Sequence, residues 1–145
     1  MGSYTGTTVE QKQPVEKVFI VNDDKQLLDM YALEFKDQGF DVVPAYGSVD
    51  AIEKLRGGVK PDVILLDVTA PVLDSFELLS ILREEKLVEN AKVIILSNDN
   101  VQASDEKSRA LGVSEYIEKT STIPSQVVQN VMTIMNKTAS SPDNT

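Results

Sequence analysis

Residues 63–67 read VILLD, a continuous apolar run that ends in one acid. Two further runs have the same form, VFIV at residues 18–21 and VIIL at residues 93–96, and polar residues follow each of them. Short apolar runs rich in β-branched side chains are typical of strands buried on both faces of a parallel sheet. Residues 40–45 and 114–117 have weaker strand character, which suits the edges of such a sheet.

Helical spacing of apolar residues fills the intervals between these strands. The expected helical faces are Leu27, Leu28, Tyr31 and Phe35; Ala51, Ile52 and Leu55; Phe76, Leu79 and Leu82; and Val127, Val128, Val131, Ile134 and Met135. A weaker, polar helix is expected from about Val101 to Leu111, and Gly39, Gly57-Gly58 and Gly112 act as helix stops.

A strand followed by a helix, repeated five times, predicts an α/β fold with helices on both faces of a parallel sheet. Right-handed crossovers leave few topologies, and we expect a doubly wound five-stranded sheet of order 2-1-3-4-5. This is a flavodoxin-like three-layer (βα)5 architecture. In such folds the functional site lies outside the carboxyl ends of the strands, here near the first and third.

The chain of 145 residues fits one domain. Residues 1–13 and 138–145 are polar and are expected to be flexible tails around a domain at residues 14–137. The first six residues match neither a secretory signal nor a myristoylation pattern, and no apolar run is long enough to span a membrane. We therefore expect a cytoplasmic protein.

The composition excludes several classes of chemistry. The chain has no cysteine and no histidine, so disulfides, thiolate or imidazole metal ligands and Ser-His-Asp catalysis are ruled out. Its net charge is −9, from 14 basic and 23 acidic residues. A nucleic-acid surface needs a basic patch, and an anionic membrane would repel this chain, so neither partner is expected.

Polar residues stand at the end of each strong strand: Asn22-Asp23-Asp24, Asp67, Ser97 and Lys119. The expected strand order brings these ends to one rim. Asp24 is read as a helix cap, and Ser97 could be one too. Two nearby carboxylates need a cation or a proton, and Mg²⁺ suits oxygen ligands. With Lys119 and Ser97, such a rim could hold a phosphoryl group on Asp67.

This set of residues resembles the receiver domain of two-component response regulators, including chemotaxis regulators, over about Lys17 to Lys137. The resemblance rests on residues 21–24, on residues 67–74, on Ser97 and on residues 116–119. It implies that Asp67 is the phosphoacceptor and that Mg²⁺ is bound by Asp23, Asp67 and the backbone carbonyl of Thr69, with Asn22 reaching it through water. It also implies that Lys119 binds the phosphoryl group, that Ser97 and Tyr116 form the switch, and that Thr69 and Asp99 tune the phosphoryl lifetime.

The resemblance is incomplete at four positions. Asn22 replaces the first acid of the family's pair, Ser75 replaces a common glycine, Asn98 replaces a small residue, and Thr120 replaces a proline. Because Asn22 lacks the charge of that acid, we expect weaker metal binding rather than none. If Ser75 needed a positive φ, its backbone would be strained. A cis peptide at Thr120 would cost about 2.5–4 kcal/mol, so a trans loop is expected.

The implied function is a phosphorylation-dependent signalling receiver, without independent enzyme activity beyond self-phosphorylation and slow autodephosphorylation. The implied partners are a sensor histidine kinase or histidine phosphotransfer protein and a downstream protein. The latter would bind the face of the 101–111 helix, the 114–117 strand and the last helix. A homodimer stays open. The alternatives are a pseudo-receiver that is never phosphorylated, motivated by Asn22, Asn98 and Thr120, and a phosphatase resembling haloacid dehalogenases.

Overall fold

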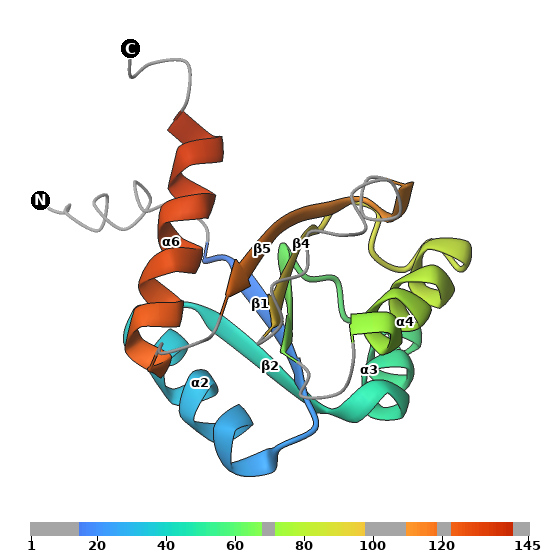
Figure 1. The fold of residues 1–145 in the computed structure, drawn as a ribbon, viewed down its shortest axis with the longest axis horizontal. Coiled ribbons are helices and arrows are strands. Elements are labelled where there is room, and N and C mark those ends of the chain that lie inside the picture. Colours follow the sequence, from blue (N-terminus) through green and yellow to red (C-terminus); the bar gives the residue numbers. More distant parts are fainter. Residues whose placement is uncertain (1–14, 68–71, 98–109, 119–122, 141–145) are drawn as a thin grey trace, which may run out of the picture.

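The computed structural model describes residues 15–67, 72–97, 110–118 and 123–140. The strands are β1 (Lys17–Asn22), β2 (Asp41–Tyr46), β3 (Val63–Asp67), β4 (Lys92–Ser97) and β5 (Val113–Glu118). The helices are α2 (Lys25–Asp37), α3 (Gly47–Arg56), α4 (Val72–Glu84) and α6 (Pro124–Ser140). All strand pairs are parallel and the order is β2-β1-β3-β4-β5, so the predicted fold and strand order are confirmed (Figure 1).

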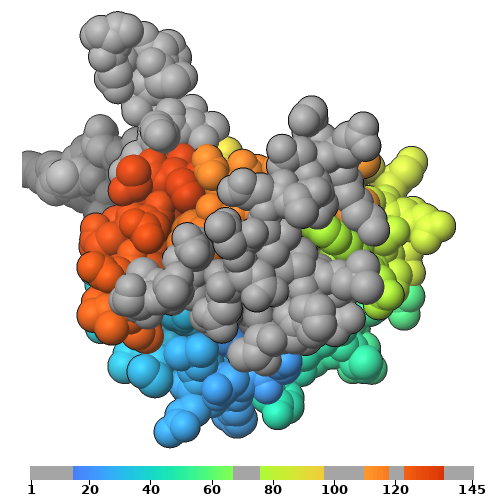
Figure 2. All heavy atoms as spheres, in the orientation of Figure 1, coloured from blue at the N-terminus to red at the C-terminus, as the bar shows by residue number. Residues whose placement is uncertain are grey.

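Two hydrophobic clusters cover the two faces of the sheet. Val18, Ile20, Val63 and Leu65 pack against α2 and α6, whereas Phe19, Val21, Ile64 and Leu66 pack against α3 and α4. Because successive side chains of a strand point to opposite faces, each central strand needs apolar residues at every position. This explains the uninterrupted runs in the sequence. Figure 2 shows α2 and α6 adjoining on one side of the molecule, with α3 and α4 on the other.

The weaker sequence signals correspond to the edges of the sheet. Residues 40–45 are close to β2 and residues 114–117 lie within β5, and these are the two outer strands. Of the helix expected at 101–111, residues 101–109 lie outside the described residues. Within the described segments, no helix has the length and apolar character needed to cross a membrane.

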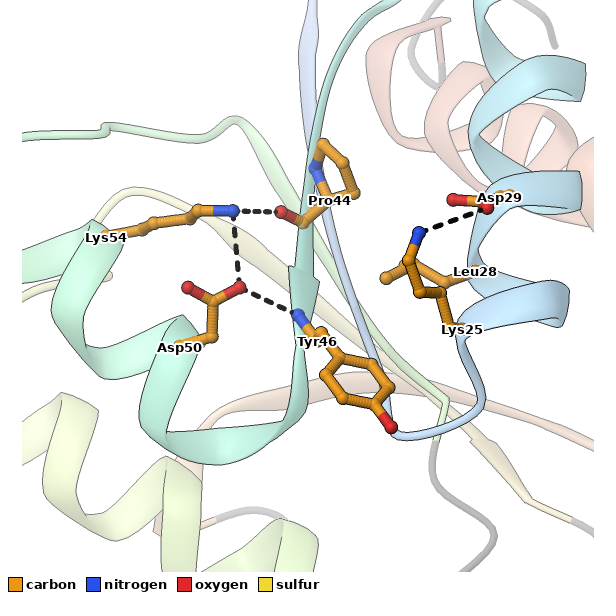
Figure 3. Close-up of a pocket in the computed structure, with 7 residues that line it drawn as sticks. All are labelled: Lys25, Leu28, Asp29, Pro44, Tyr46, Asp50 and Lys54. Carbon is orange, nitrogen blue, oxygen red and sulfur yellow. Dashed lines mark hydrogen bonds and ion pairs between the residues drawn. The ribbon is translucent and has the colours of Figure 1, made fainter.

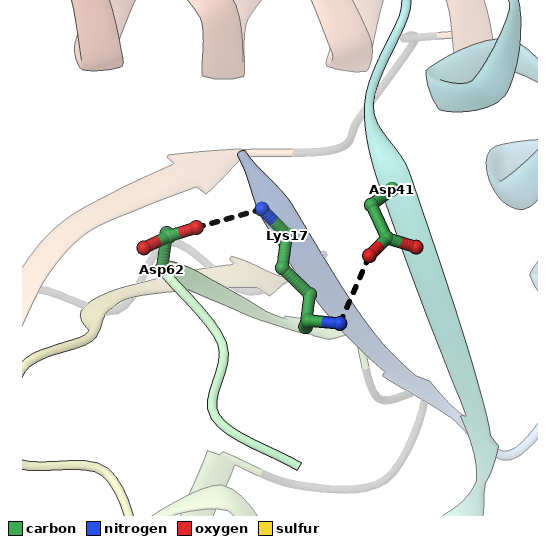
Figure 4. Close-up of polar contacts among 3 residues, drawn as sticks. All are labelled: Lys17, Asp41 and Asp62. Atoms are coloured by element: carbon green, nitrogen blue, oxygen red, sulfur yellow. Dashed lines mark hydrogen bonds and ion pairs between the residues drawn. The ribbon is translucent and has the colours of Figure 1, made fainter. Parts of the chain in front are cut away.

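The amino ends of the strands are joined through Asp62, which lies just before β3 (Figure 4). Its carboxylate accepts the backbone N–H of Lys17 at 2.8 Å, and its own N–H donates to the Lys17 carbonyl at 2.9 Å. Its carbonyl accepts the N–H of Lys92 at 2.9 Å. Asp62 thus connects the starts of β1, β3 and β4, and the Lys17–Asp41 ion pair at 2.9 Å adds the start of β2.

Arg83, in the last turn of α4, holds the segment that leads into β5. Its guanidinium donates to three carbonyls, those of Leu111 at 2.7 Å, Val88 at 3.0 Å and Gly112 at 3.2 Å. Gly112 has a φ of +77°, which side chains rarely adopt. One arginine therefore fixes both the turn before β5 and the turn after α4.

Candidate functional site

The strand register brings the predicted site residues of β1 and β3 to the same rim. Asn22 is paired with Asp67 across β1 and β3, and each is the last residue of its strand. Asp67 is paired with Leu96, so Ser97 extends one residue farther at the end of β4. Neighbouring strands lie about 4.8 Å apart. The rim therefore carries Asn22, Asp23 and Asp67 within a short distance along the sheet.

Asn22 is the fully buried polar residue of this rim, with 0% of its surface exposed. Its side-chain Oδ1 accepts the backbone N–H of Asp24 at 2.8 Å. The bond runs two residues forward, which is an Asx turn, and it fixes the direction in which the chain leaves β1. Asn22 thus has a structural role at the position where the family pattern places an acid.

Asp24 is the N-cap of α2, as predicted from the sequence. Its backbone is extended, with φ −110° and ψ 108°, and its Oδ1 accepts the N–H of Leu27 at 3.2 Å. This bond satisfies one of the backbone donors that a helix start leaves without an intrahelical partner. Asp24 is therefore occupied as a cap, whereas Asp23, between the turn and the cap, is exposed to solvent.

Of the remaining predicted site residues, some lie at strand ends or within elements and others lie outside the described residues. Asp67 and Ser97 are the last residues of β3 and β4, where the backbone of each reaches the rim. Thr69, Asp99 and Lys119 lie outside the described residues, as do Asn98 and Thr120. Tyr116 lies in β5, partly buried against the cluster that α3 and α4 cover. Ser75 lies within α4, so its backbone is helical, and the positive φ considered from the sequence does not occur.

The predicted metal donors fit a hard divalent cation in chemical type. Asp23 and Asp67 offer carboxylate oxygens, and Mg²⁺ prefers oxygen ligands while retaining several waters. In the described part of the chain, no group of three or more acids gathers as a ready metal cluster. A cation at this rim would be expected to keep several of its waters, as Mg²⁺ commonly does in proteins.

The structure also contains a pocket that sequence reasoning missed. It lies between α2, β2 and α3, has a volume of about 220 Å³, and contains none of the predicted site residues (Figure 3). Its lining residues are Lys25, Leu28, Asp29, Pro44, Tyr46, Asp50 and Lys54. The available sequence signals were the proline within an edge strand and the i,i+4 spacing of Asp50 and Lys54.

The pKa of Asp50, one of the acids that line this pocket, is lowered from its ordinary value of 3.8. The main cause is the hydrogen bond that it accepts from the backbone N–H of Tyr46 at 2.9 Å. Lys54, 3.2 Å from the carboxylate, adds to the effect, while desolvation opposes it. Asp50 is therefore fixed in position by the Tyr46 N–H and by Lys54. These groups belong to the pocket and not to the predicted phosphorylation site.

A family model, the response regulator receiver domain, matches residues 18–131 of the chain. The chain belongs to this family. The receiver match covers most of the chain and agrees with the strand order and with the acidic rim at the carboxyl ends of β1 and β3. The alternative of a pseudo-receiver is not better supported, and a match to receivers gives no support to a haloacid-dehalogenase-like phosphatase.

Known relatives agree with the receiver assignment. The chain is 26% identical to Protein PilG of Pseudomonas aeruginosa over 111 residues, which are 77% of this chain and 82% of that protein. The chemotaxis protein CheY4 of Vibrio cholerae superposes with a TM-score of 0.71 at 21% identity, covering 83% of this chain and 99% of CheY4. The response regulator TrrA of Thermotoga maritima, solved in complex with Mg²⁺-BeF, gives 0.65 at 23% identity, covering 83% and 99%. The receiver fold is thus shared with chemotaxis-type regulators.

Proposed function

We propose that this receiver domain is switched by phosphorylation of Asp67. The observation that carries the proposal is the register that pairs Asp67 with Asn22, because it sets the end of β3 beside Asp23 in a chain of the receiver family. A carboxylate oxygen of Asp67 would attack the phosphorus of a phosphohistidine on a partner protein. The phosphorus–nitrogen bond breaks, and the imidazole leaves with its electron pair and is then protonated. The donor is a partner because the chain has no histidine.

The other residues of the rim are assigned by the chemistry of the transfer. Mg²⁺ would be held by Asp23, Asp67 and the Thr69 carbonyl, with Asn22 oriented toward its water, and it would neutralise charge on the transferred group. Lys119 supplies a fixed positive charge and Ser97 a hydroxyl donor. Thr69 and Asp99 would set how fast water reaches the phosphoryl group.

The output is a change of binding surface. Phosphorylation would shift the balance between two conformations of the protein. In this proposal the two conformations differ in the positions of the Ser97 and Tyr116 side chains. The proposed partners are a sensor histidine kinase or histidine phosphotransfer protein, and a downstream protein that binds the face formed by residues 101–111, β5 and α6. We expect the protein to act in the cytoplasm, together with such phosphotransfer partners.

The test is a titration with beryllofluoride and Mg²⁺, which together mimic a phosphoryl group on a carboxylate. We expect saturable, Mg²⁺-dependent changes in backbone amide resonances of β4 and β5, and loss of these changes in Asp67→Asn. Asp24→Asn is the matched control, because it removes one acid from the same rim while asparagine still caps α2. The proposal is wrong if the parent protein does not respond, or if Asp67→Asn responds equally.

A further inference from the structure

The outer edge of β2 is a surface where another strand could pair. Among the described residues, β2 lies at the end of the sheet and is paired with β1 alone. The N–H of Asp41 donates to the Glu16 carbonyl at 3.0 Å, which points toward β1. Since alternate residues of a strand direct their backbone groups to opposite sides, Val42, Pro44 and Tyr46 face the open edge. Such an edge is a template for strand addition.

Side chains of α3 cover backbone groups on this edge (Figure 3). The Lys54 ammonium donates to the Pro44 carbonyl at 2.6 Å, and the Asp50 carboxylate accepts the Tyr46 N–H at 2.9 Å. The two side chains also pair with each other at 3.2 Å. Pro44 itself has no N–H to offer. An incoming strand would therefore meet occupied or missing groups at two of the three outward-facing residues.

The pair on α3 differs from an ordinary surface ion pair in what it contacts. Lys25 and Asp29, on the opposite wall of the same pocket, have the same i,i+4 spacing and lie 3.4 Å apart. Their side chains are 71% and 65% exposed, whereas those of Lys54 and Asp50 are 38% and 37% exposed. An exposed pair contributes little to stability. The Asp50–Lys54 pair differs because each of its side chains also forms a hydrogen bond with the backbone of β2.

We propose that Asp50 and Lys54 close the edge of β2 against strand pairing with a second copy of the chain. A second copy is the fitting partner because it presents the same edge, and two such edges can join around a two-fold axis. Tyr46, the last residue of β2, is 55% exposed, and its ring is a surface that such pairing would bury. The two side chains thus occupy the Pro44 carbonyl and the Tyr46 N–H, which an adjoining strand would otherwise use.

The test compares two double variants that both keep the net charge at −9. Asp50→Ala with Lys54→Ala removes the cover from the edge, and Lys25→Ala with Asp29→Ala removes an equivalent pair from the opposite wall. Sedimentation velocity over a range of concentrations measures self-association. We expect the first variant to associate roughly tenfold more tightly than the parent, the factor produced by about 1.4 kcal/mol. The second variant should match the parent.

A third substitution distinguishes edge pairing from general aggregation. Val42→Pro, added to the Asp50→Ala, Lys54→Ala variant, removes an outward N–H at a position where an edge strand tolerates proline. We expect it to restore the parent's behaviour. Association that survives Val42→Pro, or an uncovered variant that associates no more than the parent, overturns the proposal. If the double variant does not fold, Lys54→Met alone applies the same test, because Asp50 remains on Tyr46.

Discussion

Asn22 shows how one side chain can serve the backbone at a position where the family pattern calls for an acid. Asn22 is fully buried, and its carboxamide oxygen accepts the Asp24 N–H in a part-buried hydrogen bond. A carboxylate could accept the same bond, but it would add a third negative group beside Asp23 and Asp67. The asparagine therefore keeps the turn while leaving the rim with one charge fewer. Weaker metal binding stays a prediction.

Asn22→Ala should lower the free energy of unfolding by about 1 kcal/mol, because the part-buried Asp24 N–H loses its side-chain acceptor. Urea unfolding followed by circular dichroism measures the change. Asp24→Asn is the control, since it keeps both the N–H and a capping side chain. A loss below about 0.5 kcal/mol, the scale of ordinary surface changes, would contradict the role assigned to Asn22.

At the scale of elements, the Arg83 contacts tie the end of α4 to the start of β5. Gly112 is central to them, because a Cβ added there would lie 2.5 Å from the Arg83 Nη2. Glycine is therefore favoured at this position by its positive φ, and a Cβ there would force the hydrogen-bonded guanidinium to shift.

Gly112→Ala should destabilise the protein more than Gly39→Ala, which is the matched control. Both glycines have a positive φ, +77° and +96°, but a Cβ on Gly39 meets nothing within 4 Å. We expect about 1–2 kcal/mol at Gly39 from the backbone alone. At Gly112 we expect about 1 kcal/mol more for each arginine bond that is lost. Equal losses in thermal or urea unfolding would show that the Arg83 contacts contribute nothing.

The stability that Asp50 contributes at the start of α3 should depend on pH. The pKa of Asp50 is lowered in the folded protein, so its ionised form contributes stability above the ordinary value of 3.8. That contribution is lost as the pH falls through the lower, folded pKa. The destabilisation caused by Asp50→Ala should therefore be constant at neutral pH and shrink below pH 3.8. Urea midpoints of both proteins from about pH 6 to about pH 3 measure it, and a difference that grows on acidification would contradict it.

Burial explains which elements could be predicted from the sequence. β1, β3 and β4 are covered on both faces, so their apolar runs are uninterrupted and easily recognised. β2 gave a weaker signal because it is an edge strand that carries Pro44. The apolar face of α3 was recognised from Ala51, yet the helix begins at Gly47, because Asp50 stabilises its first turn through the Tyr46 N–H.

Some features of the candidate site could be predicted from the sequence and others could not. The clustering of Asn22, Asp23 and Asp67 follows from strand order, which the alternation of elements determines, and the capping role of Asp24 follows from local chemistry. The Asx turn of Asn22 and the bonds of Asp50 and Lys54 depend on side-chain rotamers and tertiary contacts, which sequence spacing does not specify. The roles of Thr69, Asp99 and Lys119 stay predictions.

At the scale of the whole molecule, cation binding at one rim should stabilise the entire fold. A ligand at ten times its dissociation constant adds about 1.4 kcal/mol to the free energy of unfolding. We therefore expect Mg²⁺ to raise the thermal midpoint in a saturable way, relative to KCl of equal ionic strength. Asp23→Asn should abolish this increase. A parent protein that Mg²⁺ leaves unchanged, or a variant that it still stabilises, would contradict the assigned ligands.

The opposite end of the sheet has a consequence for how this protein can vary. Asp62 joins the starts of three strands, and none of the proposed reacting groups lies at that end. Changes there alter the fraction of molecules that are folded and leave the chemistry of each folded molecule intact. Substitutions at Asp62 could therefore change the stability of this chain with little effect on the proposed phosphoryl chemistry at the opposite rim.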